Sequence, residues 1–158
     1  MFGRRGFCST FFFVICQAVS NNFCDYYLEL ENQVFCGENG YLVRYGYPYC
    51  SRFTSPEYYD LFDEPGQKWV DCTAKCLLVK TRQIVEKEVG KAGVNCEKIE
   101  VEAFEVHTEC YRECNFCQIC RTNKFALISV FDPVDLFYPK TLNQVYEIGT
   151  MCGFQCFF

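Results

Sequence analysis

The 158-residue sequence has a single histidine and no Gly-x-Ser-x-Gly motif. Ser/His/Asp and Cys/His catalytic arrangements both need a histidine as the general base, so either would have to be built around His107. No pair of carboxylates stands out by its spacing as a general acid and base. We therefore predict that the protein is not an enzyme and has no catalytic residue, no metal ion and no cofactor.

The sequence also lacks long apolar runs, alternating apolar and polar runs, internal repeats and Asn-x-Ser/Thr sequons. No stretch approaches the about 20 apolar residues that a membrane-spanning helix needs. A sheet with one solvated face would show the alternation, so its absence favours an all-α fold. Without a sequon, no N-linked glycan is expected.

Basic residues are outnumbered, with 15 Lys and Arg against 20 Asp and Glu and a net charge of −5. This balance argues against binding to nucleic acid or to an anionic membrane surface. A basic partner or a cation is easier to accommodate.

The N-terminus resembles a secretory signal. Two arginines precede a largely apolar segment over residues 7–16, and small residues follow at positions 18 and 20. This order is typical of a cleaved signal peptide, and the apolar segment is short for the alternative, a membrane anchor. We predict a signal peptide over residues 1–20 and one secreted, extracellular domain over residues 21–158, without stable membrane insertion.

Cysteine is abundant, at 14 residues, and 12 remain after residues 1–20 are removed. This density and an even number are typical of a disulfide scaffold in a secreted chain. Cys72 and Cys76 are four apart, as are Cys110 and Cys114, and such positions share one face of a helix. If the two helices are antiparallel, Cys76 meets Cys110 and Cys72 meets Cys114. The sequence thus predicts an antiparallel helical hairpin closed by two disulfides.

The other cysteines leave more freedom, since sequence alone does not fix connectivity. The same helical argument favours Cys117–Cys152 and Cys120–Cys156, and among the remaining four we favour Cys24–Cys50 and Cys36–Cys96. An iron–sulfur or zinc site is the alternative for Cys114-x2-Cys117-x2-Cys120, but the signal peptide and the even number favour disulfides.

Apolar periodicity and capping residues predict further helices. Residues 37–48, rich in Gly and Tyr, are expected to form an irregular connection, and Cys117 is expected on the face of the second long helix. The expected helices are residues 23–34, 55–62, a long helix from Asp63 to about Gly90, a second long helix from Asn95 or Cys96, a segment over 123–131 and a last helix containing Leu142, Val145, Ile148, Cys152 and Cys156.

Two features of the second long helix have competing interpretations. His107 and the residues after it resemble the helix of secreted phospholipase A2, and residues 45–50 resemble the calcium loop of that family. Thr108 stands where the family has a calcium-binding Asp, and a neutral Thr cannot replace that carboxylate, so we expect His107 to be a partly buried helix residue. The acidic stripe Glu102, Glu105, Glu109 and Glu113 is expected to be a solvated helix face rather than a weak calcium site or a contact for a basic partner.

The spacing of several short motifs resembles the stanniocalcin family. These motifs are Tyr49-Cys50, Phe62-Asp63-x-x-Gly66-Gln67-Lys68-Trp69-Val70, Lys75-Cys76-Leu77, Cys96 and Glu109-Cys110-Tyr111-x-x-x-Asn115-x-Cys117. The resemblance implies a secreted, helical, disulfide-linked homodimer that acts as a hormone in calcium and phosphate balance, and some members restrain a secreted metalloprotease. It also implies the pairs Cys36–Cys96, Cys76–Cys110 and Cys117–Cys152, with Cys50 joined to an earlier cysteine.

The long C-terminal tail of that family, with its dimer-linking cysteine, is missing here. Cys156 is the candidate replacement for the dimer link. We therefore expect a stanniocalcin-like signalling protein that binds an extracellular receptor or protease. A secreted, disulfide-stapled inhibitor or effector is the alternative, and a degenerate phospholipase A2-like enzyme is the third.

Overall fold

The computed structural model describes residues 23–156, apart from the side chain of Phe154. The signal peptide expected over residues 1–20 lies outside this range. Among the described residues, no helix is both long enough and apolar enough to cross a membrane.

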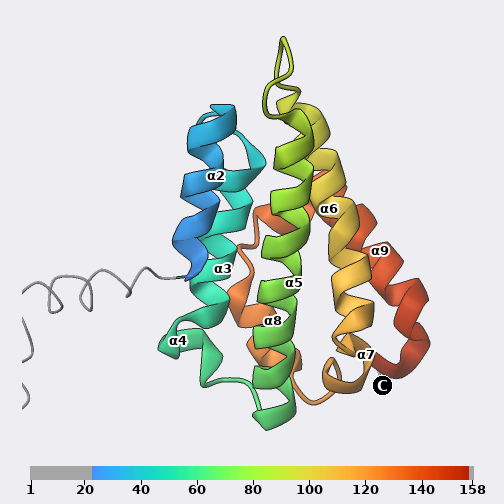
Figure 1. Cartoon of the computed structure of the whole chain (residues 1–158). Coiled ribbons are helices and arrows are strands. Elements are labelled where there is room, and N and C mark those ends of the chain that lie inside the picture. The colour runs from blue at the N-terminus through green and yellow to red at the C-terminus, as the bar shows by residue number, and fades with distance from the viewer. Residues whose placement is uncertain (1–22, 157–158) are drawn as a thin grey trace, which may run out of the picture.

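Residues 23–156 contain helices and connections without a strand, as predicted (Figure 1). The helices in chain order are η1 (Phe23–Asp25), α2 (Tyr26–Val34), the π-helix η2 (Leu42–Gly46), α3 (Tyr47–Thr54), α4 (Pro56–Tyr59), α5 (Glu64–Glu88), α6 (Cys96–Glu113), α7 (Phe116–Ile119), α8 (Lys124–Val130), η3 (Asp135–Phe137), α9 (Pro139–Cys152) and η4 (Gly153–Cys156).

The hairpin of α5 and α6 is the centre of the fold, and local capping explains its boundaries. The Asp63 carboxylate accepts a hydrogen bond from the Gly66 N–H (2.8 Å) at the start of α5, and the Asn95 side chain accepts one from the Lys98 N–H (2.9 Å) at the start of α6. Both caps satisfy backbone donors that a helix leaves unpaired at its N-terminus. Gly90, with φ +83°, allows the chain to turn after α5.

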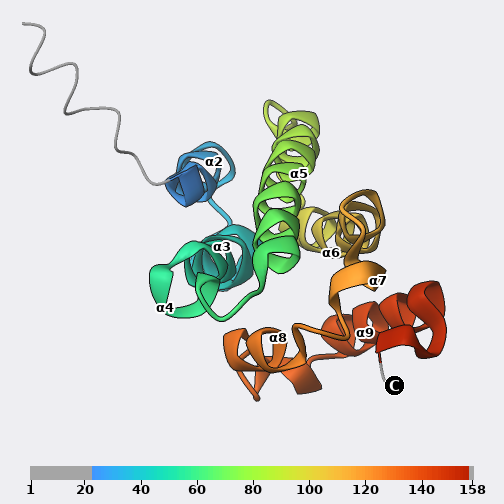
Figure 2. The ribbon, with the colours of Figure 1, turned by 90° about the horizontal axis from the view of Figure 1, so that it is seen from below.

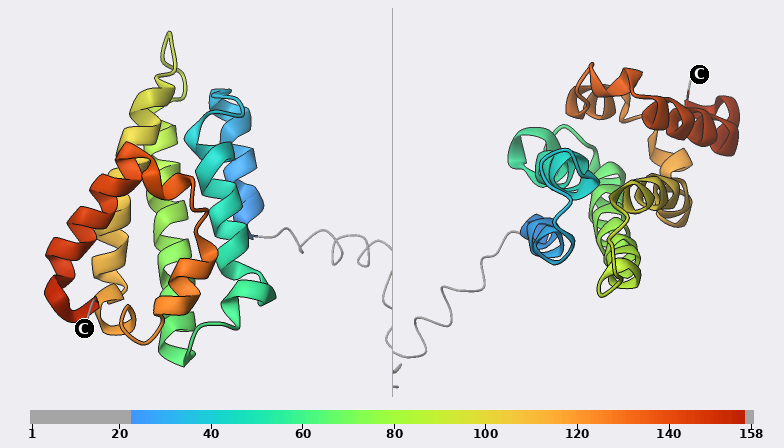
Figure 3. Two further views of the ribbon diagram at one scale, coloured as in Figure 1. Left: turned by 180° about the vertical axis from the view of Figure 1, so that it is seen from behind. Right: turned by 90° about the horizontal axis from the view of Figure 1, so that it is seen from above.

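The other helices lie in two groups around this hairpin. The α2, η2 and α3 helices lie beside α5, whereas α8, η3 and α9 form an outer layer across the back of the molecule (Figures 2 and 3). Two apolar clusters result. The N-terminal cluster includes Tyr27, Leu30, Leu42, Val85 and Ile99, and the C-terminal cluster includes Trp69, Val70, Tyr111, Phe116 and Ile119.

The irregular connection expected over residues 37–48 was wrong from residue 42 onward, where the structure has the π-helix η2 followed by α3. Pro48 occupies the first turn of α3, where its missing N–H costs nothing. Gly46 lies against Tyr27, and a Cβ there would come within 2.5 Å of the Tyr27 ring. This glycine permits close helix packing rather than a loop.

Two helix ends also differ from expectation. The α6 helix stops at Glu113, because Asn115 has φ +63°, a left-handed conformation that ends a helix. Cys117 therefore lies on α7. The α9 helix likewise ends at Cys152, and Cys156 lies on the short 3-10 helix η4.

Candidate functional site

The disulfides place every cysteine of residues 23–156 in a pair within the chain. The pairs are Cys24–Cys50, Cys36–Cys96, Cys72–Cys114, Cys76–Cys110, Cys117–Cys152 and Cys120–Cys156. Their Cα atoms are between 5.1 and 5.8 Å apart, within the usual range. These are the pairs favoured from the sequence, and the hairpin of α5 and α6 is closed twice, as predicted.

This pairing bears on two alternatives. Cys114, Cys117 and Cys120 each bond to a different cysteine, so none of them offers a thiolate to a metal. The Cys156 sulfur bonds to that of Cys120 (2.02 Å). A dimer link through Cys156 does not fit this pairing, because the link would require the bond to open.

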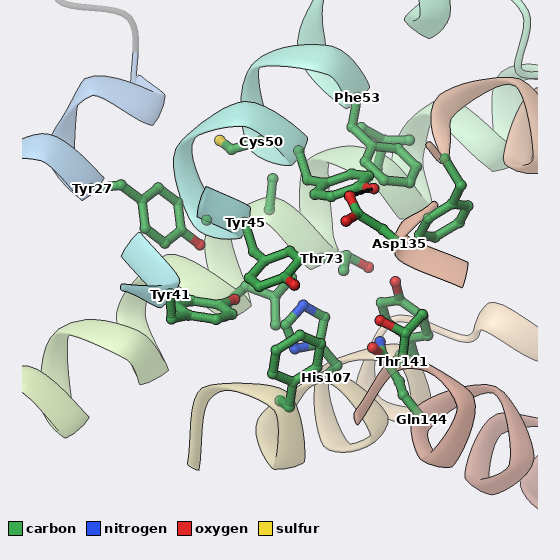
Figure 4. A pocket seen from close by; sticks show the side chains of 18 of the residues that line it. Tyr27, Tyr41, Tyr45, Cys50, Phe53, Thr73, His107, Asp135, Thr141 and Gln144 are labelled. Atoms are coloured by element: carbon green, nitrogen blue, oxygen red, sulfur yellow. Dashed lines mark hydrogen bonds between the residues drawn. The ribbon is translucent and has the colours of Figure 1, made fainter. Parts of the chain in front are cut away.

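A central cavity of about 80 Å³ lies between the two apolar clusters (Figure 4). Aromatic rings from η2, α3, α5 and α6 form much of its wall. Its polar lining includes Tyr45, Trp69, Thr73, His107, Asp135 and Gln144. The phenol of Tyr49 donates a hydrogen bond to the Asp135 carboxylate (2.6 Å).

His107 is the residue of this cavity that the sequence singled out as a possible catalytic group. Its Nδ1 lies 2.7 Å from the Ala103 carbonyl oxygen, and since a carbonyl can only accept, Nδ1 carries the proton and Nε2 is the acceptor. The ring stacks on Phe104 (5.8 Å between centroids). Burial lowers the pKa of His107 to about 4, so the imidazole is neutral and a weak base at neutral pH.

The phospholipase-like pattern does not assemble around His107. The Thr108 hydroxyl donates a hydrogen bond to the Glu147 carboxylate (2.8 Å). Residues 45–50, which resemble a calcium loop in sequence, are helical. The expectation that His107 is a partly buried helix residue agrees with its position on α6.

The acidic stripe of α6 is partly used inside the hairpin. The Lys80 ammonium on α5 lies 2.6 Å from the Glu109 carboxylate and 2.9 Å from that of Glu113. The hydrogen bond from Lys80 lowers the pKa of Glu109. Glu102 lies 3.6 Å from Lys98, and Glu105 is exposed. The stripe therefore joins α5 to α6 as well as facing solvent.

The outer layer carries an apolar surface that sequence reasoning did not identify. Seven large apolar side chains of α8, η3 and α9 and of the turn before η3 are exposed, including Phe125 at 88% and Phe137 at 79%. We call this surface the charge-free face, and its residues are Phe125, Ile128, Val134, Phe137, Leu142, Val145 and Tyr146.

None of the exposed residues between positions 125 and 150 is charged. The charged residues of that segment are partly buried and bonded: Lys140 lies 2.9 Å from Glu100, Asp132 accepts from the Val134 N–H, Asp135 accepts from Tyr49 and Glu147 accepts from Thr108. Ala126 and Val130 of α8 and Gln144 of α9 are buried, so the charge-free face is the side of the layer that points away from the hairpin. Monomeric proteins rarely expose large apolar patches, and such patches often mark binding sites.

The periodicity of α9 contained a signal for this face. Leu142 and Val145 share one side of the predicted helix with Ile148 and Cys152, but they are exposed whereas Cys152 is buried. When the apolar side of a helix is only partly covered by the rest of the domain, the exposed part of that side indicates a contact with another molecule.

Comparison of the chain with protein-family models, with curated proteins and with solved structures found no match.

Proposed function

We propose that the protein is a secreted, non-enzymatic signalling protein, similar to the stanniocalcins in cysteine spacing, that binds an extracellular receptor or protease as a non-covalent homodimer. The charge-free face is the observation that carries the proposal. Six disulfides suit an oxidising extracellular environment. The neutral His107, bonded to its own helix, favours a role in packing over one in catalysis.

The size of the charge-free face supports a dimer. Three of its side chains are aromatic, and each exposes on the order of 150 Å², while the four aliphatic ones expose about 100 Å² each at most. Together they offer on the order of 800 Å² per subunit, the amount that a standard-size interface buries on each partner.

The charge distribution favours a second copy of the chain as the occupant. After loss of residues 1–20 the net charge is −7, because two of 15 basic residues and none of 20 acidic residues are removed. Two such chains repel each other wherever their acidic surfaces meet. The exposed side chains that a two-fold contact through the charge-free face brings together are apolar or polar and uncharged, and the half-exposed charged residues of this layer already have partners within the chain. The remaining, acidic surface stays available to a receptor or protease.

Light scattering during gel filtration of the secreted protein tests the dimer. We expect twice the chain mass for the wild type and the single-chain mass for Phe137→Glu, because the substitution would bury a carboxylate in the contact. Val79→Glu is the matched control, since Val79 is exposed at 55% but lies on α5, and this variant should remain dimeric. A monomeric wild type at tens of micromolar would contradict the proposed dimer.

Two measurements on the same sample test the rest of the proposal. Mass spectrometry should give a chain that starts at Asn21 and has no free thiol. A calcium-dependent lipolysis assay should show no activity above background. Lipolysis that His107→Ala abolishes would overturn the non-enzymatic assignment.

A further inference from the structure

The central cavity holds polar groups that the fold leaves without partners. Among residues 23–156, the Tyr45 hydroxyl, the Trp69 indole N–H and the Thr73 hydroxyl are buried and make no hydrogen bond. All three residues line the cavity, and each is 5% exposed or less. Unpaired buried polar groups are costly and rare in folded proteins, so these three groups mark a place where another molecule can complete the bonding.

The donors and acceptors among these groups indicate which kind of molecule could form hydrogen bonds with them. An indole N–H can only donate, and the two hydroxyls can donate or accept. The His107 Nε2 is an acceptor, because Nδ1 donates to the Ala103 carbonyl. Figure 4 shows Tyr45, Thr73 and His107 facing the same space. A single hydroxyl group has two acceptor lone pairs and one proton, so it can accept from both Tyr45 and Thr73 while it donates to His107, which neither an ether nor an ammonium can do.

The walls of the cavity select an uncharged molecule. Val70, Ala74 and Leu77 supply apolar surface, and none of the lining residues is Lys or Arg. An anion would therefore enter without a counter-charge, at a high desolvation cost. The one acidic lining residue, Asp135, already accepts the hydrogen bond from Tyr49, which leaves less of its charge for a cation.

We propose that the central cavity is a binding site for small uncharged alcohols. The alcohol hydroxyl bonds to Tyr45, Thr73 and His107, and the alkyl group packs on the apolar wall. The cavity of about 80 Å³ is roughly half the size of the about 150 Å³ engineered cavity that accepts benzene, so it fits an alkyl group of about three to four carbons. This site is separate from the charge-free face and does not depend on the proposed dimer.

Trp69 provides the measurement, because it is the only tryptophan in the sequence and lines the cavity. We would titrate the oxidised protein with butan-1-ol and follow the tryptophan emission, with butanoate and butylamine as charged molecules of the same chain length. The alcohol should change the emission in a saturable way with a millimolar Kd, and neither ion should do so. Equal responses to all three compounds, or a response to butan-1-ol that never saturates, would overturn the proposal.

Variants separate binding in the cavity from a general effect of alcohol. Tyr45→Phe and Thr73→Val remove one hydroxyl each with little change of shape and should weaken butan-1-ol binding about 2- to 10-fold, the range for one hydrogen bond. Ala74→Leu should fill the cavity and abolish binding. Thr150→Val, at an exposed threonine of α9, is the control and should bind normally. Unchanged affinity in the three cavity variants, or a crystal structure grown with butan-1-ol that shows only water in the cavity, would refute the site.

Discussion

At the scale of single residues, His107 makes the stability of the fold depend on pH. Burial lowers its pKa from 6.5 to about 4, so the unfolded chain binds a proton between these values and the native chain does not. The contribution of His107 to stability should therefore be lost as the pH drops from about 6.5 to about 4 and should not change further below that. At 1.36 kcal/mol per pKa unit, the loss is about 3 kcal/mol at most.

Urea unfolding at pH 7, 5 and 4 measures this effect, provided that the titration of the carboxylates over the same pH range is subtracted. His107→Gln keeps a polar side chain on α6 but cannot titrate, so the carboxylates contribute equally to both proteins. The free energy of unfolding should decrease more steeply with acid in the wild type than in His107→Gln. Parallel pH profiles for the two proteins would show that the pKa of His107 is not lowered in the native state.

At the scale of elements, the two disulfides of the hairpin should not act independently. While Cys76–Cys110 is intact, Cys72–Cys114 closes only a loop of about ten residues, and its loss costs about 2.5 kcal/mol. Without either disulfide, the unfolded chain also gains the conformational entropy of an open loop with a sequence separation of 34. The total loss of stability then rises to about 6 kcal/mol. Losing both pairs should thus cost more than twice the loss of one.

Paired alanine substitutions make the comparison clean because they leave no unpaired thiol. The three variants are Cys72→Ala with Cys114→Ala, Cys76→Ala with Cys110→Ala, and all four changes together. Their free energies of unfolding in denaturant complete a double-mutant cycle. Simple additivity, with the fourfold variant equal to the sum of the two pairs, would contradict this coupling between the staples.

Much of this element-level structure was predictable from the sequence, for identifiable physical reasons. The hairpin has strong local signals in the caps at Asp63 and Asn95 and in cysteines four apart, and each signal depends on only a few neighbouring residues. The helical segment at residues 42–54 was missed because its reason is tertiary. Gly46 is required by the Tyr27 ring, which is 19 positions away in the sequence, and a glycine between tyrosines is otherwise typical of a connection.

The central cavity and the charge-free face were less predictable for the same kind of reason. A periodic pattern shows which side of α9 is apolar, but not that α9 buries Thr141 and Gln144 instead of Leu142 and Val145. Nor can it show that Tyr45, Trp69 and Thr73, which come from two different helices, leave polar atoms unpaired around one cavity. Both features depend on how closely neighbouring helices pack against each other in the folded chain, which local sequence patterns do not determine.

At the scale of the whole molecule, a fold cross-linked by six disulfides carries one uncharged, apolar face on an otherwise acidic surface. Cys36–Cys96 joins the N-terminal helices to the hairpin. Cys117–Cys152 joins α7 to α9, and Cys120–Cys156 joins the turn after α7 to η4. The charge-free face is therefore held on a layer that is tied to the rest of the fold. A pre-ordered apolar surface loses little conformational entropy on association, which favours the proposed dimer.

Thermal unfolding at several concentrations tests that dimer in the intact molecule. If folded dimers unfold to separate chains, mass action raises the Tm with protein concentration, by about 3 °C for each tenfold increase in a domain of this size. Added salt should raise the Tm of the wild type relative to that of Phe137→Glu, because it screens repulsion between two acidic subunits only in the dimer, whereas it weakens the ion pairs within each chain equally in both proteins. Phe137→Glu should show a lower Tm that does not change with concentration. A wild-type Tm that stays constant over a 100-fold dilution, or that responds to added salt no differently from that of Phe137→Glu, would mean that the charge-free face is not an interface between two copies of the chain.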